Sequence, residues 1–160
     1  MSIHSARVSW ARGEAAFEMK TYVRDHQAAF DGGVTLPMSA AAGPAVPPGT
    51  VGAATVDPEE LTVAAVSSCH MLFFLALAAK RGLVIDAYDD APSGVLESRE
   101  GATSLTKITL RPRVRWGGTA PDAAVVHELH EGAHRRCYIA NSLKSEIVIE
   151  EGGGELAEAT

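Results

Sequence analysis

The chain has 160 residues, 46% of them apolar and 21% charged, and its 14 basic against 20 acidic residues give a net charge of -6. This length and composition suit one globular domain with a sizeable core. The negative charge repels a phosphate backbone, so we expect no nucleic-acid partner. We expect the domain to span residues 1–151, followed by a disordered tail over residues 152–160.

The N-terminal residues 1–14 lack the charged region, apolar core and small-residue cleavage site of a secretory signal. One apolar run, residues 61–79, is long enough to suggest a membrane span, but it carries Ser67, Ser68 and His70 at its centre. We therefore expect a cytoplasmic protein that does not insert into a membrane, with this run as the core helix of a soluble domain.

Short strands and loops are predicted for the first third of the chain. Residues 3–10 and 15–23 alternate loosely between apolar and polar side chains, and with Gly13 between them they predict an antiparallel hairpin. Residues 34–37 predict a short edge strand. The segment 39–52 is rich in Ala, Gly and Pro, and this composition predicts a loop that leads into a helix.

A long central helix is predicted over residues 58–81. Asp57 is the expected N-cap, with Pro58 at the first helical position and Glu60 placed three residues on for a capping box. Apolar and small side chains then surround the predicted helix on almost every side. We therefore expect a helix that is buried on most sides.

The second half of the chain predicts further strands and one more helix. Residues 83–90, 93–99 and 103–116 have strand-like patterns, 119–136 an amphipathic helical pattern, and 143–150 the pattern of a last strand. The order of elements is typical of an α+β fold with a segregated antiparallel sheet.

Two cysteines, Cys69 and Cys137, are candidate redox centres or ordinary core residues, because a chain without an export signal is not expected to use them as a structural disulfide. For Cys69 alone, a small apolar residue of a buried helix is the commoner role. A thiol of ordinary pKa is mostly protonated near neutral pH, so a nucleophilic Cys69 needs a nearby cation. The candidates are Arg12 and Arg24. Cys137, at the end of the second predicted helix, is the candidate resolving thiol that condenses with an oxidised Cys69.

A carboxylate such as Glu59 or Glu60 can orient an arginine by a bidentate contact. Glu59 precedes Cys69 by ten residues, which places it about 15 Å away along the same straight helix. Either the contact with Cys69 comes from a partner subunit across a two-fold axis, or Glu59 is only a residue of the helix start.

A metal site is the competing prediction. His130-Glu131-Gly132-Ala133-His134 matches H-E-x-x-H on a predicted helix, with two imidazoles on one face and Glu131 as a possible base for zinc hydrolysis. The longer zinc-protease pattern is not continued, because Cys137 and Ala140 stand where Gly and a third His are wanted. The structural alternative is a pair of surface histidines on a solvated helix face, and we expect no metal.

Two stretches resemble a known family. VDPEELTVAAVSSC (56–69) and the apolar run after it resemble the central-helix motif of the OsmC/Ohr family, the osmotically inducible and organic-hydroperoxide-resistance proteins. CYIANS (137–142), ahead of the last strand, is similar to the family's second-cysteine segment. Asp57 replaces the family's usual Asn, and Tyr138 replaces the proline of the hydroperoxide-resistance branch, so the chain resembles the OsmC-like branch.

The resemblance implies roles for individual residues. Cys69 falls on the family's peroxidatic cysteine, Cys137 on its resolving cysteine and Glu59 on its active-site glutamate. Arg12 is the best match to the family's arginine, with Arg24 as the alternative.

The resemblance also implies a fold and an activity. We expect antiparallel sheets with a long buried central helix and a second amphipathic helix, in an intertwined homodimer with active sites at the subunit interface. The implied activity is thiol-dependent reduction of organic hydroperoxides without a cofactor, with re-reduction by a dithiol, a dihydrolipoyl group in some members. The alternative is a non-catalytic dimer of the same scaffold that binds a small apolar ligand.

Overall fold

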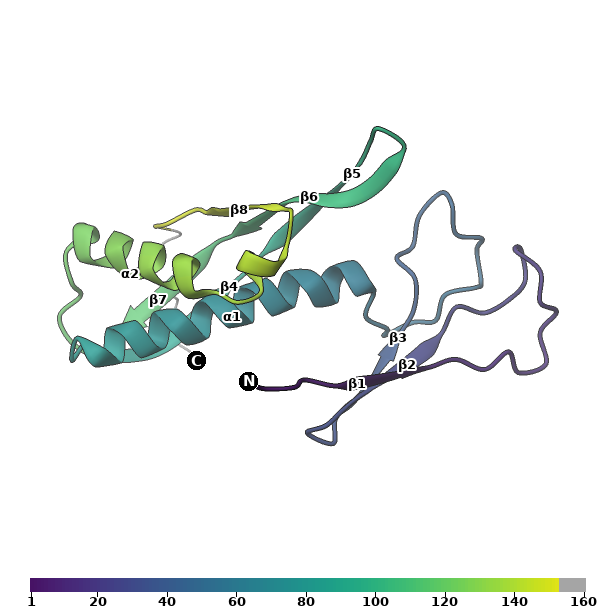
Figure 1. Cartoon of the computed structure of the whole chain (residues 1–160), viewed down its shortest axis with the longest axis horizontal. Helices are drawn as coiled ribbons and strands as arrows, with labels where there is room; N and C mark the ends of the chain where they lie inside the picture. The colour runs from purple at the N-terminus through teal and green to yellow at the C-terminus, as the bar shows by residue number, and fades with distance from the viewer. Residues whose placement is uncertain (153–160) are drawn as a thin grey trace. The chain divides into compact units, whose positions relative to one another are not determined.

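The computed structural model describes residues 1–152, and these form two compact units, Met1–Leu61 and a second unit that begins at Thr62 (Figure 1). In chain order the elements are β1 (Ala6–Ser9), β2 (His26–Phe30), β3 (Thr35–Met38), α1 (Pro58–Lys80), β4 (Ile85–Asp90), β5 (Ser93–Arg99), β6 (Ala102–Leu110), β7 (Pro112–Trp116), α2 (Ala123–Arg136), the short 3-10 helix η1 (Ala140–Ser142) and β8 (Glu146–Ile149). The predicted α+β class is confirmed. Residues 153–160 of the predicted tail lie outside the described residues.

The first unit is built on the antiparallel sheet β1-β2-β3, which pairs Ala6 with Phe30 and Ala29 with Thr35. The prediction of a hairpin between residues 3–10 and 15–23 was wrong, because β1 pairs with β2 and residues 15–23 form turns and irregular chain. The apolar residues of that segment pack as an aromatic cluster around Trp10 instead. The alternation of apolar and polar residues in 15–23 therefore reflects side chains that pack on the aromatic cluster, and these residues form no strand.

The predicted loop over residues 39–52 is confirmed, and the carboxylate of Asp25 holds its two ends. One oxygen of Asp25 accepts hydrogen bonds from the Ser39 hydroxyl at 2.8 Å and from the Gly52 backbone N–H at 2.7 Å. A Cβ at Gly52 would collide with this carboxylate, so the close approach requires glycine. The bonds fix the loop against the start of β2.

Helix α1 begins as the sequence predicts. Asp57 accepts a hydrogen bond from the Glu60 N–H at 2.7 Å, and Glu60 accepts one in return from the Asp57 N–H at 3.1 Å. This is a complete capping box, and it satisfies donors that the first turn leaves free.

The expectation that α1 is buried on most sides was wrong for the single chain. Its fully buried residues form one stripe with a spacing of four, Val66, His70, Phe74 and Ala78. The helix is long and apolar enough to cross a membrane by length and composition, a test that core helices of soluble proteins also pass. Only 22% of its most apolar window is buried, because the neighbouring elements of one chain cover a single face.

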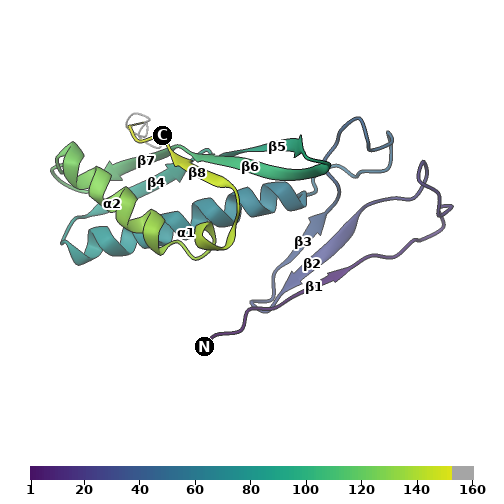
Figure 2. The ribbon, with the colours of Figure 1, turned by 45° about the horizontal axis from the view of Figure 1, so that its top comes forward.

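In the second unit the two helices pack on the strands (Figure 2). Phe74 and Ala78 of α1 pack with Leu129 and Ala133 of α2 in one core cluster, and Val66 packs with β6 in another. Strand β4 pairs with β7, and β5, β6 and β8 form a second sheet. The expected antiparallel arrangement needs one correction, since β8 runs parallel to β6. The connection between these two strands passes through α2, and a parallel pair requires such a crossover.

Candidate functional site

The structure brings Cys69 and Cys137 together although 68 residues separate them in the sequence. Cys69 projects from the middle of α1 and is partly exposed, whereas Cys137 caps the C-terminus of α2 and is completely buried. Both cysteines are free, and they lie close enough for the Cys69 side chain to affect the pKa of Cys137. One thiol is therefore partly accessible, and the second is buried near it.

Burial is the main cause that raises the pKa of Cys137, to about 11, and the neighbouring Cys69 side chain raises it further. The backbone N–H of Ala140 lies 3.3 Å from the Cys137 sulfur and opposes this rise in pKa, as does the N–H of Ile139. The Cys137 thiol is also within 3.9 Å of the Val66 carbonyl, a long and weak contact. Cys137 is therefore a protonated thiol near neutral pH.

Cys69 opens into an apolar cavity of roughly 500 Å³. Its lining residues are Ala65, Ser68, Cys69, Leu72, Phe73, Ala76, Tyr138 and Ile139. The ring of Tyr138 meets the ring of Phe73 edge-on, with centroids 5.1 Å apart. Leu72 and Tyr138 are 60% and 72% exposed, so this side of α1 is an apolar surface that the second unit itself does not cover.

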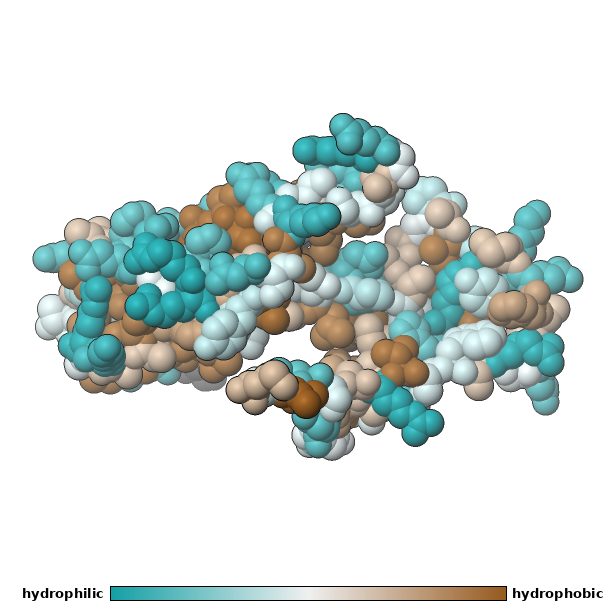
Figure 3. Space-filling view, viewed as in Figure 1, coloured by the Kyte–Doolittle hydropathy of each residue, from teal (hydrophilic) through white to brown (hydrophobic). Residues whose placement is uncertain are grey.

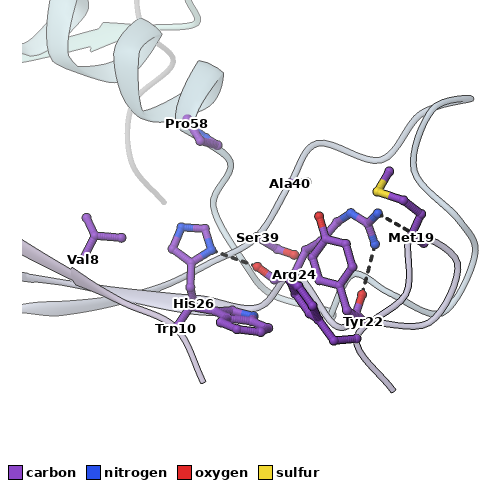
Figure 4. Close-up of a pocket in the computed structure, with 10 residues that line it drawn as sticks. Val8, Trp10, Met19, Tyr22, Arg24, His26, Ser39, Ala40 and Pro58 are labelled. Carbon is purple, nitrogen blue, oxygen red and sulfur yellow. Dashed lines mark hydrogen bonds between the residues drawn. The ribbon is translucent and has the colours of Figure 1, made fainter. Parts of the chain in front are cut away.

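The two candidate arginines belong to the first unit and differ in how firmly they are held. Arg24 donates hydrogen bonds to the carbonyls of Tyr22 and Met19, both at 3.1 Å, and its guanidinium lies 4.2 Å from the centroid of the Tyr22 ring (Figure 4). Arg12 is exposed and donates one bond to the Ala15 carbonyl at 3.2 Å. Arg24 is therefore the fixed cation of the pair.

The two candidate carboxylates also differ. Glu60 takes part in the capping box, so its side chain is engaged at the helix start. Glu59 lies in the first turn of α1 and is partly exposed. Glu59 and Cys69 stand on one continuous helix, and ten residues of helix rise separate them by about 15 Å.

A buried histidine pair joins α1 to α2, and sequence reasoning missed it. Nε2 of His70 and Nδ1 of His130 are 3.0 Å apart, and the two residues are 1% and 2% exposed. Their rings are nearly parallel, with centroids 5.4 Å apart. Because one nitrogen must donate and the other accept, the two imidazoles share a single proton in this contact.

The prediction of surface histidines in HEGAH was wrong for His130, which faces the interior. His70 occupies its Nδ1, while Glu131 pairs with Arg135 on the outer side of the helix at 3.3 Å. Within residues 1–152, no group of three or more His, Cys, Asp or Glu side chains is arranged to hold a metal ion. The alternative of zinc hydrolysis through His130 and His134 therefore gains no support from this geometry.

A signal for the histidine pair is present in the sequence. His70 stands four residues after Val66 and four before Phe74, on the stripe that α1 buries. His130 follows Leu129, the buried residue of α2 that packs against this stripe. A polar residue at a stripe position needs a partner on the facing helix, and histidine on the opposite helix can supply it.

The OsmC-like protein family matches residues 51–152 of the chain. Among curated proteins, the uncharacterized protein YmaD of Bacillus subtilis is 22% identical over 96 residues, which are 59% of this chain and 64% of YmaD. The chain thus spans somewhat less than two thirds of the length of that relative.

Solved structures of the same family are similar over nearly the whole chain. An OsmC-like protein of unknown function from Vibrio cholerae is 44% identical with a TM-score of 0.87, covering 94% of this chain and 99% of its own. The organic hydroperoxide resistance protein OhrB of Bacillus subtilis has a TM-score of 0.63 and 18% identity, covering 91% and 96%. The likeness to OhrB is a likeness of fold.

The histidine pair predicts a loss of stability in acid. Burial first, then the charges of His130 and His134, lower the pKa of His70 from 6.5 to about 4, and burial also lowers the pKa of His130. The folded state favours neutral imidazoles, so their contribution is complete above pH 6.5 and is lost as the pH falls below it. We expect urea unfolding between pH 6.5 and about 4 to show that the free energy of unfolding falls less steeply with decreasing pH in His70→Leu than in the wild type. The difference in slope should be up to about 1.4 kcal/mol per pH unit.

The matched control is His4→Leu, which removes an exposed imidazole of the first unit that is not part of the buried pair. This variant should keep the wild-type pH dependence of the unfolding free energy. Equal slopes for wild type and His70→Leu would show that the buried pair does not resist protonation.

Proposed function

Because the chain belongs to the OsmC-like family, we propose that it is a thiol-dependent peroxidase that reduces organic hydroperoxides. The observation that carries the proposal is that a partly exposed Cys69 and a buried Cys137 lie near each other, close enough for Cys69 to affect the pKa of Cys137. A peroxidase cycle needs one thiol that meets the substrate and one that waits beside it. Solved relatives of the same fold include proteins named for organic hydroperoxide resistance, which supports the proposed substrate class.

In the first step, the Cys69 thiolate attacks the terminal oxygen of the hydroperoxide. The S–O bond forms as the O–O bond breaks, and the leaving alkoxide takes a proton and departs as the alcohol. Cys69 is then a sulfenic acid. The Cys137 thiol attacks its sulfur, the S–S bond forms, and the hydroxyl leaves with the Cys137 proton as water. The raised pKa of Cys137 keeps that proton in place until this step.

Arg24 is the cation that we propose for activating Cys69, in preference to Arg12. A guanidinium lowers the pKa of a neighbouring thiol and donates hydrogen bonds to peroxide oxygens. Arg24 is already oriented by two carbonyls and the Tyr22 ring, so less side-chain entropy is lost when it binds. Glu59 is the proposed carboxylate that orients the arginine, since Glu60 is engaged in the capping box.

A homodimer is the proposed assembly. The apolar side of α1 that carries Leu72 and the Cys69 cavity remains exposed in the second unit. Hydrophobic side chains also reach the surface in both units (Figure 3). Exposed apolar surface of this kind marks an interaction site. A second copy on this face would let Glu59 serve the Cys69 of the other chain, since its own Cys69 lies about 15 Å away along the same helix.

An external dithiol, such as a dihydrolipoyl group, is the proposed reductant. Cys69 is the sulfur that a cavity reaches, whereas Cys137 is completely buried. The dithiol therefore attacks the Cys69 sulfur of the disulfide, Cys137 leaves as a thiolate and takes up a proton, and the second thiol of the reductant releases Cys69.

The two thiols should be consumed together. One equivalent of cumene hydroperoxide should remove both titratable thiols of the wild type but only one of Cys137→Ser, whose Cys69 has no neighbour to condense with. Cys69→Ser should keep its Cys137 thiol, and its turnover with dihydrolipoamide should fall by at least about 100-fold because serine is a much weaker nucleophile. If the wild type keeps both thiols after hydroperoxide treatment, the non-catalytic binding alternative is favoured.

Substitutions of Arg24 and Arg12 should have different effects on peroxidase kinetics. Arg24→Ala should lower kcat/KM for the hydroperoxide by about tenfold or more, the loss expected from about 1.4 kcal/mol of transition-state stabilisation. In a Cys137→Ser background, the rate of Cys69 alkylation by iodoacetamide at one fixed neutral pH should be lower in Arg24→Ala than in the parent. Arg12→Ala is the matched control and should stay within about twofold of wild type. The reverse order would transfer the role to Arg12.

The mass in solution tests the dimer. Light scattering after gel filtration should give twice the chain mass for wild type, and Leu72→Lys should shift the population toward the monomer because it places a charge on the apolar face. Val34→Lys is the matched control, since Val34 is similarly exposed just before β3 in the first unit. A monomeric wild type at micromolar concentration would contradict the proposed assembly.

A further inference from the structure

The first unit contains a cavity of its own, with a volume of roughly 630 Å³. Its walls come from β1, from the connection between β1 and β2, and from the chain around β3 and the start of α1 (Figure 4). This volume lies in the range of small-molecule sites. The side chains used below are Trp10, Phe17, Met19, Tyr22, Arg24 and His26.

Three aromatic rings form one corner of this cavity. Phe17 contacts both Trp10 and Tyr22, with ring centroids 5.7 and 5.5 Å away and interplanar angles of 50° and 53°. Trp10 and Tyr22 are 6.2 Å apart and nearly perpendicular. Rings set at such angles present both faces and edges, an arrangement that holds a further aromatic ring by edge-to-face contact.

The corner is apolar surface that its own unit leaves open. Phe17 and Met19 are each 69% exposed, and Trp10 is 42% exposed. The indole N–H of Trp10 donates to the Val23 carbonyl at 2.8 Å, so the polar end of this ring is engaged and its apolar part remains for contact. A bound apolar group would remove much of this surface from water.

The polar end of the cavity is cationic. Arg24 uses two of its five N–H donors in hydrogen bonds within the described part of the chain, and its guanidinium plane is fixed by the Tyr22 ring. His26 stands beside it, with Nδ1 directed to the Arg24 carbonyl at 2.9 Å. No carboxylate is among the described residues that line the cavity. This charge favours a ligand head made of oxygen acceptors.

We infer that this cavity binds the aryl group of an aryl-alkyl hydroperoxide, with the aromatic corner of Trp10, Phe17 and Tyr22 around the ring and Arg24 on the peroxide oxygens. The inference rests on the proposed function for the identity of the head group. It adds the substrate class: a ring on a short alkyl carbon fits an angled corner beside a cation, whereas hydrogen peroxide has no apolar part to bind. The alcohol product, which keeps the ring and one oxygen, binds at the same place.

Binding can be measured without turnover. Trp10 lines the cavity, while the only other tryptophan of the chain, Trp116, packs against the core of the second unit. Cys69→Ser protein is titrated with 2-phenyl-2-propanol, and a saturable change in tryptophan emission is expected. The half-saturating concentration should be at least about tenfold lower than for tert-butanol, which lacks the ring. The change should be absent in Cys69→Ser/Trp10→Phe.

The aromatic corner is then tested by Phe17→Ala. In the Cys69→Ser background this change should weaken binding of 2-phenyl-2-propanol by about fivefold to tenfold. With Cys69 present, it should lower kcat/KM for cumene hydroperoxide by about fivefold more than for tert-butyl hydroperoxide, mainly through KM. Val34→Ala, an exposed apolar residue outside the cavity, is the matched control and should leave both values unchanged.

The inference is overturned if the two alcohols bind alike, or if Phe17→Ala affects both hydroperoxides equally. It is also overturned if the emission change follows protein concentration and not ligand, because a second copy of the chain would then cover the corner. The two proposals fail separately. If the protein binds the aryl alcohol but its thiols do not react with hydroperoxide, the proposed cavity is supported and the peroxidase is rejected. If the thiols react but the aryl alcohol does not bind, the peroxidase is supported and the proposed cavity is rejected.

Discussion

The packing of α1 through a single four-residue stripe is the constraint on which the second unit depends. Val66 joins one core cluster with β6, and Phe74 joins the other with α2 and β4, so a single helix links both clusters. Residues spaced by four lie on one face of a helix, and this leaves the next face free. That free face carries Cys69 and its cavity, which explains how a core helix can also present an accessible thiol.

The same packing explains why the two thiols differ. Cys137 enters the core where α2 ends, and its burial makes the proton hard to remove. Cys69 lies next to the buried stripe and lines a cavity, so its thiol is less buried than that of Cys137. In the proposed cycle, this difference in environment would assign the two thiols to successive steps. The accessible thiol would meet the substrate, and the buried one would keep its proton until its neighbour is oxidised.

Features that depend on neighbouring residues were predicted from the sequence more successfully than contacts between distant residues. The capping box of Asp57 and Glu60 was predicted and is confirmed, because all of its atoms lie within one turn. The partner of β1 was predicted wrongly, because alternation in residues 15–23 could not show that Phe17 and Tyr22 pack against Trp10 and form no strand. His130 was placed on the surface for the same reason, since its partner His70 lies 60 residues away.

By itself, the sequence determined the α+β class, both long helices, the loop before α1 and the two cysteines as candidates for redox chemistry. These follow from hydrophobic periodicity, caps and residue type, which act over a few neighbouring residues. Only the tertiary structure decided that Cys137 is buried near Cys69, that Arg24 is held by two carbonyls and a ring but Arg12 by one carbonyl, and that one stripe of α1 is buried. Burial and contact between distant residues depend on how the elements pack, and no local pattern contains that information.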